Sequence, residues 1–194
     1  MTRHKRSEET IRRLLDTALD IYPDDFTLRA LTARSGVSMG SVYHHFGSLE
    51  GLAAALYSRC MGALLDTLIS AVDQATDARD GVRRAVTAYL GFTADHPGEA
   101  RFIHAAPYAI DLGPYAERIA ADKAPRLERL NGWILGHMDA GTVARLPVAQ
   151  VEMLLIGPVA EVTRRWLAGA PEIDLAEAAQ VLPDRVWRSL SARL

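Results

Sequence analysis

Residues 38–45 bring together several polar side chains, in the order Ser-Met-Gly-Ser-Val-Tyr-His-His. Hydroxyl, phenol and imidazole groups can hold a metal ion, activate a nucleophile, or form hydrogen bonds to bases and phosphates. A metal site is not expected, because His44 and His45 point about 100° apart on a helix and no Cys, Asp or Glu lies at a ligand spacing nearby. No glycine-framed serine resembles a nucleophile elbow, and no glycine loop could cradle phosphates. We therefore expect no catalytic residue, no metal and no cofactor.

The sequence around this group predicts two short helices joined by a tight turn. Thr27 and Ser38 are each a natural N-cap, because their hydroxyls can accept from a free backbone N–H. Gly36 lies between them and can adopt a left-handed conformation at little cost. The inward positions are expected to be Leu28 and Leu31 in the first helix, and Val42 and Phe46 in the second. Two helices joined in this way describe a helix-turn-helix, whose second helix enters the DNA major groove.

The rest of the chain also has helical periodicity. Ser7 is the expected cap of a first amphipathic helix, which should end before Pro23. Further helices are expected over residues 48–74, 80–96, 111–139 (interrupted by prolines 114 and 125), 147–168 and 174–193. No segment alternates apolar and polar residues as a strand does. The predicted fold class is all-α.

Composition and charge limit the class of protein. The chain has 194 residues, 49% hydrophobic and 24% charged, which excludes wholesale disorder. A basic start without a following apolar core argues against a secretory signal, and the single Cys60 fits a reducing compartment, so a cytoplasmic location is expected. Residues 1–13 carry five positive and two negative charges, although the whole chain has a net charge of −2. That basic end suits either an anionic partner or an unordered, solvated tail.

The segment from Thr27 to Leu52 resembles the DNA-binding region of the TetR (tetracycline-repressor) family of bacterial transcriptional regulators. That family has a pattern close to T-x-x-x-[IL]-A-x-x-[AS]-G-V-S-x-G-x-[VL]-Y-x-[HY]-F-x-[ST]-K-x-x-L. The chain matches it at Thr27, Leu31, Ser35, Gly36, Val37, Ser38, Gly40, Val42, Tyr43, His45, Phe46, Ser48 and Leu52. Two departures are Thr32 in place of alanine, which places a hydroxyl in a packed turn, and Leu49 in place of lysine, which removes one phosphate contact.

The resemblance implies which residues contact DNA. They are Thr27, Ser38, Met39, Gly40, Ser41, Tyr43, His44 and His45, with Arg3, Lys5 and Arg6 on an arm before the first helix. Serine hydroxyls can contact base edges or phosphates, and Met39 can touch a thymine methyl. The alternatives are that Tyr43 only packs between helices and that Gly40 only permits tight helix packing.

The resemblance also implies two domains. Residues 5–56 would form the DNA-binding domain, with the helix-turn-helix at about 28–47, and residues 57–194 a helical domain for ligand binding and dimerisation. The expected ligand-binding residues are Phe92, Phe102, His104, Tyr108, Tyr115, Trp133 and His137. An ordinary core with satisfied histidines explains the same residues. The expected dimer interface, on the last two helices, comprises Leu155, Val159, Val162, Trp166, Val186, Trp187 and Leu190.

Together these features predict a homodimeric transcriptional regulator that binds a pseudo-palindromic operator. The resemblance implies a repressor that a small effector releases from DNA, and no membrane partner. Two alternatives remain. One is a DNA-binding activator without an effector, and the other is a helical small-molecule-binding protein or enzyme.

Overall fold

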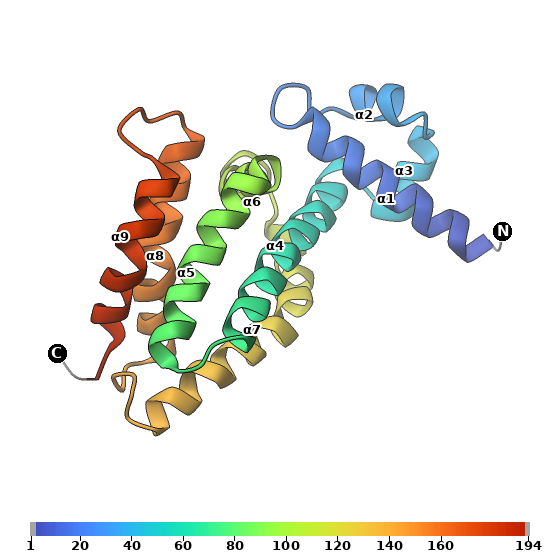
Figure 1. Cartoon of the computed structure of the whole chain (residues 1–194). Helices are drawn as coiled ribbons and strands as arrows, with labels where there is room; N and C mark the ends of the chain where they lie inside the picture. Colours follow the sequence, from blue (N-terminus) through green and yellow to red (C-terminus); the bar gives the residue numbers. More distant parts are fainter. Residues whose placement is uncertain (1–2, 193–194) are drawn as a thin grey trace. The chain divides into compact units, whose positions relative to one another are not determined.

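The computed structural model describes the backbone of residues 3–192 and the side chains of residues 5–192. These residues fold almost entirely into helices (Figure 1). In chain order the helices are α1 (Arg3–Ile21), α2 (Leu28–Ser35), α3 (Met39–Phe46), α4 (Leu49–Asp73), α5 (Ala78–Asp95), α6 (Pro97–Ala109), the short 3-10 helix η1 (Gly113–Tyr115), α7 (Ala116–Asp139), α8 (Val148–Leu167) and α9 (Leu175–Leu190). Within residues 3–192 there is no strand, and the predicted all-α class is confirmed.

The chain divides into two compact units. The first contains Met1–Met61 and Arg101–Asp122, and the second contains Gly62–Ala100 and Lys123–Leu194. This division differs from the predicted boundary after residue 56, because a later segment of the chain joins the first unit. The predicted domains were based on continuous stretches of sequence, whereas the units follow packing.

The core of the first unit is apolar and draws on α1–α4 and α6. Leucine, alanine, valine and phenylalanine side chains from these helices are fully buried. They include Leu14, Ala18, Leu31, Val42, Leu52, Leu56 and Phe102. Burying a large apolar side chain contributes roughly 1.5–3 kcal/mol. An ion pair between Arg59 and Asp16 (2.6 Å) also joins α4 to α1 at the surface.

The second unit is built around α5, which packs against both α8 and α9, while α8 also packs against α9 (Figure 1). Val82, Val86, Val159 and Leu190 are fully or almost fully buried in this unit. After α9, an isolated antiparallel bridge pairs Val143 with Ser191. The three helices therefore share one core, and only their outer sides remain available to partners.

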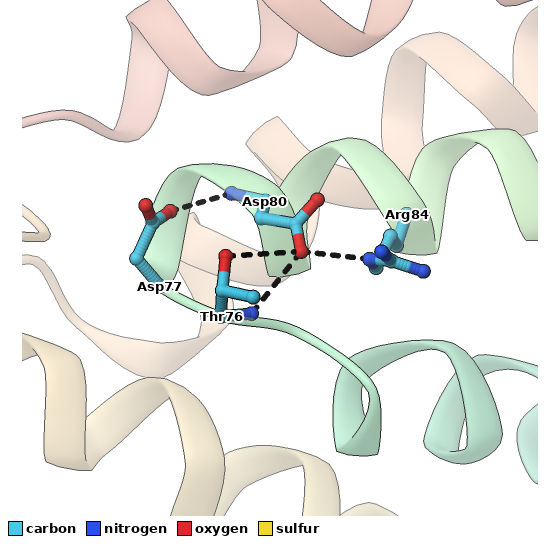
Figure 2. A network of polar contacts seen from close by, with 4 residues as sticks. All are labelled: Thr76, Asp77, Asp80 and Arg84. Atoms are coloured by element: carbon cyan, nitrogen blue, oxygen red, sulfur yellow. Dashed lines mark hydrogen bonds and ion pairs between the residues drawn. The ribbon is translucent and has the colours of Figure 1, made fainter.

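Figure 2 shows the polar network that sets the start of α5. The Asp77 side chain accepts from the Asp80 backbone N–H (2.8 Å), and the Asp80 carboxylate accepts from the Thr76 N–H (3.1 Å) and from Arg84 Nε (2.7 Å). The Arg84 hydrogen bond and then the Thr76 N–H lower the pKa of Asp80. Because Asp77 caps the helix, α5 begins at Ala78 rather than at the predicted Asp80.

Three other helix predictions need correction. Ser7 is not a cap, since α1 already begins at Arg3. Lys5 precedes Glu9 by four residues, and Thr10 Oγ1 donates to the Arg6 carbonyl (2.9 Å), so helical contacts span residue 7. Residues 97–109 form α6, which the sequence pattern did not predict as a separate helix. Pro125 does not interrupt α7, because it is exposed and water can satisfy the carbonyl that loses its partner.

Helix α4 is long and strongly apolar. Among the described residues, it is the helix with the length and mean hydropathy (1.3) of a membrane span, and 56% of that window is buried inside the protein. The burial of Leu52, Leu56, Leu64 and Leu68 shows that its apolar residues belong to protein cores. Its hydropathy is that of a core helix.

Two buried threonines form a polar pair between α5 and α8. The Thr93 hydroxyl lies 3.1 Å from the Tyr89 carbonyl oxygen and 3.1 Å from the Thr163 hydroxyl, and both threonines are fully buried. A hydroxyl has one proton. Because Thr93 donates to Tyr89, Thr163 must donate to Thr93.

This assignment predicts unequal effects of two isosteric substitutions. Thr93→Val leaves the Thr163 proton buried without its acceptor and should lower the free energy of unfolding by about 1–3 kcal/mol. Thr163→Val leaves the Thr93–Tyr89 bond intact and should cost less, and the double variant should cost less than the sum. Urea unfolding followed by circular dichroism measures all three. Additive effects, or a larger loss for Thr163→Val, would contradict the pairing.

Candidate nucleic-acid interface

The predicted helix-turn-helix caps are present. Thr27 Oγ1 accepts from the Ala30 N–H (3.1 Å) at the start of α2. Ser38 Oγ accepts from the Ser41 N–H (3.2 Å) at the start of α3. Side-chain caps of this kind contribute about 1 kcal/mol each, so both short helices have defined starts.

The turn between α2 and α3 depends on Gly36, which has a φ of 66° and ends α2 in the left-handed conformation. The buried Ser35 side chain accepts from the Val37 N–H (3.2 Å) inside this turn. Thr32, the departure from the family pattern, directs its hydroxyl to the Leu28 carbonyl (2.9 Å). The hydroxyl therefore finds a partner within its own helix, and the turn is not disturbed.

Helix α3 exposes several polar and large side chains and buries two apolar ones. Val42 and Phe46 face the core, as predicted. Met39 is 49% exposed and Tyr43 is 47% exposed, and His44 is also exposed. Ser38 is exposed as well, whereas Ser41 and His45 are half-buried. Exposure of Tyr43 disfavours the alternative that it only packs between helices.

Gly40 has no packing role within the chain. A Cβ built at this position would meet nothing closer than Ser38 Oγ, at 4.0 Å. The alternative that Gly40 permits tight helix packing is therefore not supported. The space beside its backbone is open to a partner outside the chain.

The amino-terminal residues are not an arm before α1. Lys5 and Arg6 lie within α1 with exposed side chains, and α1 begins at Arg3. The prediction that these basic residues precede the helix was wrong, but their positive charges still lie at the amino-terminal end of α1. The side chain of Arg3 lies outside the described residues.

Thr27 is also more constrained than expected, since its hydroxyl lies 3.2 Å from the Asp25 carboxylate while it caps α2.

Two exposed arginines of α2, Arg29 and Arg34, were not among the predicted contact residues. Arg29 lies on the side of α2 away from the buried Leu31, whereas Arg34 is exposed in the last turn of the helix. The periodicity of α2 could have identified Arg29, because its position is off the predicted inward face, but not Arg34, which follows the inward Leu31 by three residues. They add positive charge to the helix that precedes the turn.

The segment 101–122 contacts the helix-turn-helix region at two places in the first unit. The buried Phe102 ring of α6 lies 4.7 Å from the Tyr22 ring and 6.1 Å from the Phe26 ring, between ring centroids. The Tyr115 hydroxyl lies 3.0 Å from the Ser48 hydroxyl, just before α4. Both aromatic residues were predicted to bind a ligand, and the structure places them beside the turn between α1 and α2 and beside the start of α4.

The other predicted ligand-binding residues are scattered. Tyr108 is 90% exposed and His104 is half-buried, both in the first unit. In the second unit Phe92 is buried, and the Trp133 ring contacts His137 edge-on (4.5 Å). A Cβ on Gly81 would lie 2.1 Å from the Trp133 ring. The Trp133 ring therefore fills the space between α5 and α7. Ligand binding by these residues stays a prediction.

The second unit also has an open groove of about 770 Å³, lined by residues of α4, α5 and α9. Its charged groups are largely paired. Arg84 pairs with Asp80, Asp66 pairs with Arg126, and Arg83 reaches Asp184 (3.3 Å). None of the predicted ligand-binding residues lines this groove.

The predicted dimer residues fall into two groups. Val159, Val186 and Leu190 are buried within the subunit, which removes them from an interface with a second chain. Leu155, Val162, Trp166 and Trp187 are half-buried. Helical periodicity identified apolar faces on α8 and α9 but could not separate the side facing α5 from the outer side. The exposed Met153 (69%) and Val181 (50%) were missed.

Comparison with known proteins is consistent with this geometry. Residues 23–56 match the family model described as bacterial regulatory proteins, tetR family. An HTH-type transcriptional regulator of Mycobacterium tuberculosis is 30% identical over 97 residues, which are 48% of this chain and 50% of that relative. The chain thus spans about half the length of the curated relatives of this group.

Two further proteins match over nearly the whole chain. The HTH-type transcriptional regulator BetI 1 of Chromohalobacter salexigens is 24% identical over 96% of this chain and 91% of its own length. The crystal structure of the regulator FadR from Bacillus subtilis, in complex with stearoyl-CoA, has a TM-score of 0.76 at 16% identity, and the match covers 90% of this chain and 96% of that one. The matching family model lies on the helix-turn-helix described above, so the predicted resemblance of this region to the tetR family of bacterial regulatory proteins is confirmed.

Proposed function

We propose that the protein binds a pseudo-palindromic DNA operator as a homodimer and represses transcription from it. The single observation that carries this proposal is the outer side of α3. Met39, Gly40, Tyr43 and His44 are exposed there, and Gly40 has no packing role within the chain. An α-helix with such a side fits the DNA major groove, with its first residues at the base edges. A cytoplasmic location follows from access to DNA.

Selection of bound DNA from a random double-stranded pool tests this function and provides the operator sequence. A dimer should select two inverted half-sites whose centres are about one helical turn apart, or a multiple of this distance. Failure to enrich any sequence, at salt concentrations where other DNA-binding proteins succeed, would overturn the proposal. It would favour the helical small-molecule-binding protein or enzyme.

Replacing Tyr43 and His44 with alanine should weaken operator binding. Each lost base or phosphate contact should cost on the order of 1–3 kcal/mol. Because both side chains are exposed, thermal unfolding and helical content should change little. Fluorescence anisotropy with labelled operator gives the affinity. A double variant that binds operator as tightly as the wild type would show that α3 is not the reading helix.

Gly40→Ala separates DNA contact from folding. The new methyl group enters open space and improves helix propensity, so stability should be unchanged or rise by up to about 1 kcal/mol. If DNA approaches the Gly40 backbone, operator affinity should nevertheless fall about tenfold or more, as for one lost contact. Gly91→Ala is the matched control, since Gly91 also lies within a helix, and a Cβ added there would meet no atom within 4 Å. Equal operator affinity for both variants would contradict a close approach at Gly40.

The outer sides of α8 and α9 support dimerisation. Met153 and Val181 are large apolar residues exposed on these helices, and Leu155 and Trp187 on the same helices are half-buried. Two such helix pairs, one from each chain, can form a two-fold four-helix interface. A stable interface of this kind should bury at least about 1,200 Å².

Replacing Met153 and Val181 with glutamate should therefore produce a monomer. An unpaired carboxylate buried at an interface costs several kcal/mol, whereas an exposed one costs little. Sedimentation velocity at micromolar concentration measures the mass. Leu135→Glu is the matched control, because Leu135 is an exposed apolar residue on α7. A wild-type monomer would contradict dimerisation, and a double variant that remains dimeric would place the interface elsewhere.

A small-molecule effector is the remaining part of the proposal. It is supported by the fold shared with FadR, which binds stearoyl-CoA in its crystal structure. An effector must bind the DNA-free state more tightly, and a typical coupling of 1–3 kcal/mol weakens operator binding about 5- to 150-fold. Titrating amphipathic acyl compounds such as stearoyl-CoA into the protein–operator complex tests this. Release of DNA separates the effector-controlled repressor from an activator that has no effector.

A further inference from the structure

The hydroxyl of Ser48 is the centre of a polar cluster at the start of α4, within the first unit. It accepts from the Gly51 backbone N–H (3.0 Å) and lies 3.0 Å from the Tyr115 hydroxyl. The pKa of Glu50 is lowered, first by its own backbone N–H and then by the Ser48 side chain. A serine hydroxyl has one proton and two lone pairs. Ser48 accepts from the Gly51 N–H, and its hydroxyl shares a hydrogen bond with the Tyr115 hydroxyl in which either group can donate.

Tyr115 is held by a turn of its own. The Asp111 carboxylate accepts from the Gly113 N–H (3.0 Å), and the Tyr115 N–H donates to the Leu112 carbonyl (3.0 Å). Pro114 restricts the same turn. The ring of Tyr115 is thus presented by an ordered segment rather than by a free loop. Removal of its hydroxyl would take one hydrogen-bond partner from the half-buried Ser48.

The same cluster borders the end of α3. A Cβ on Gly51 would lie 2.0 Å from the Phe46 carbonyl oxygen and 3.1 Å from the Tyr115 hydroxyl. The last turn of α3 and the first turn of α4 therefore touch backbone to backbone, and Tyr115 lies at that contact. Because Met39–Phe46 is a helix of only about two turns, a shift at its end changes the direction of its exposed side.

We propose that Tyr115 is a positioning residue for α3, acting through its hydrogen bond to Ser48 at the start of α4. The inference rests on the proposed DNA binding by α3. It assigns a role in DNA recognition to a residue 69 positions beyond the end of α3 that has no expected contact with DNA. The segment between α6 and α7 thereby becomes part of the DNA-reading structure.

Tyr115→Phe removes only the hydroxyl and should lower operator affinity by about 2- to 12-fold, the equivalent of one hydrogen bond. Ser48→Ala should also weaken binding, and the double variant should bind no more weakly than Ser48→Ala alone. Ser48→Thr keeps a hydroxyl and should retain wild-type affinity. The slope of log affinity against log salt should stay unchanged, because no phosphate contact is lost. Tyr22→Phe is the matched control, since Tyr22 contacts Phe102 through its ring.

Measurements at a temperature where every variant is fully folded separate positioning from stability. A merely structural role would lower the unfolding temperature of Tyr115→Phe and leave its operator affinity at that of the wild type. That outcome would overturn the inference. The inference would also be overturned if the losses of operator affinity in Ser48→Ala and Tyr115→Phe multiplied in the double variant. Such a result would show that the two hydroxyls act independently.

Amide hydrogen exchange tests the positioning role without DNA. In Tyr115→Phe, exchange should become faster at Gly51 and along α3, by a factor similar to the loss of affinity, and should stay unchanged in the second unit. Wild-type exchange rates in α3 would overturn the inference even if no operator were found. Wild-type protein that selects no DNA would instead overturn the proposed function.

Discussion

The contact between the Phe46 carbonyl oxygen and Gly51 determines how α3 is held. A methyl group at Gly51 would lie 2.0 Å from that oxygen, so the corner between α3 and α4 exists only with glycine at this position. Gly47, with a φ of 77°, ends α3 and begins the corner. Ser48 then caps α4. The exposed side of α3 is consequently fixed by backbone contact, which is stiffer than contact through flexible side chains.

Among the buried polar side chains of the described residues, Ser35, Thr93 and Thr163 are hydrogen-bonded, whereas the buried Ser58 hydroxyl has no partner. Thr93 and Thr163 satisfy each other between α5 and α8, and Ser35 accepts a backbone N–H inside the helix-turn-helix. Surface ion pairs such as Arg79 with Asp184 are partly exposed and contribute little individually. Stability therefore comes mainly from apolar burial, and the polar pairs select which helix faces meet.

Helices α8 and α9 illustrate how one apolar surface serves two purposes. Their inner residues, among them Val159 and Leu190, complete the core around α5. Met153 and Val181 remain exposed on the same helices. A helix that is apolar on more than one side is either fully buried or awaits a partner. A second copy of the chain bound at these exposed residues would form a two-fold dimer, and such a dimer matches a two-fold operator.

Local chemistry controls the helix-turn-helix, so the amino-acid sequence was enough to predict it. The caps Thr27 and Ser38, the left-handed Gly36 and the spacing of Val42 and Phe46 all act within a few residues, and each is found as predicted. Local rules also predicted a cap at residue 7, and this was wrong, because α1 already begins at Arg3.

Packing, in contrast, settled what periodicity left open. Periodicity identifies the apolar face of a helix but not the element that packs on it. The buried residues of α8 and α9 were therefore identified only from the packing of these helices on α5. The contact of Tyr115 with Ser48 joins residues 67 positions apart. No local rule reaches that far, because such a contact depends on how the whole unit folds.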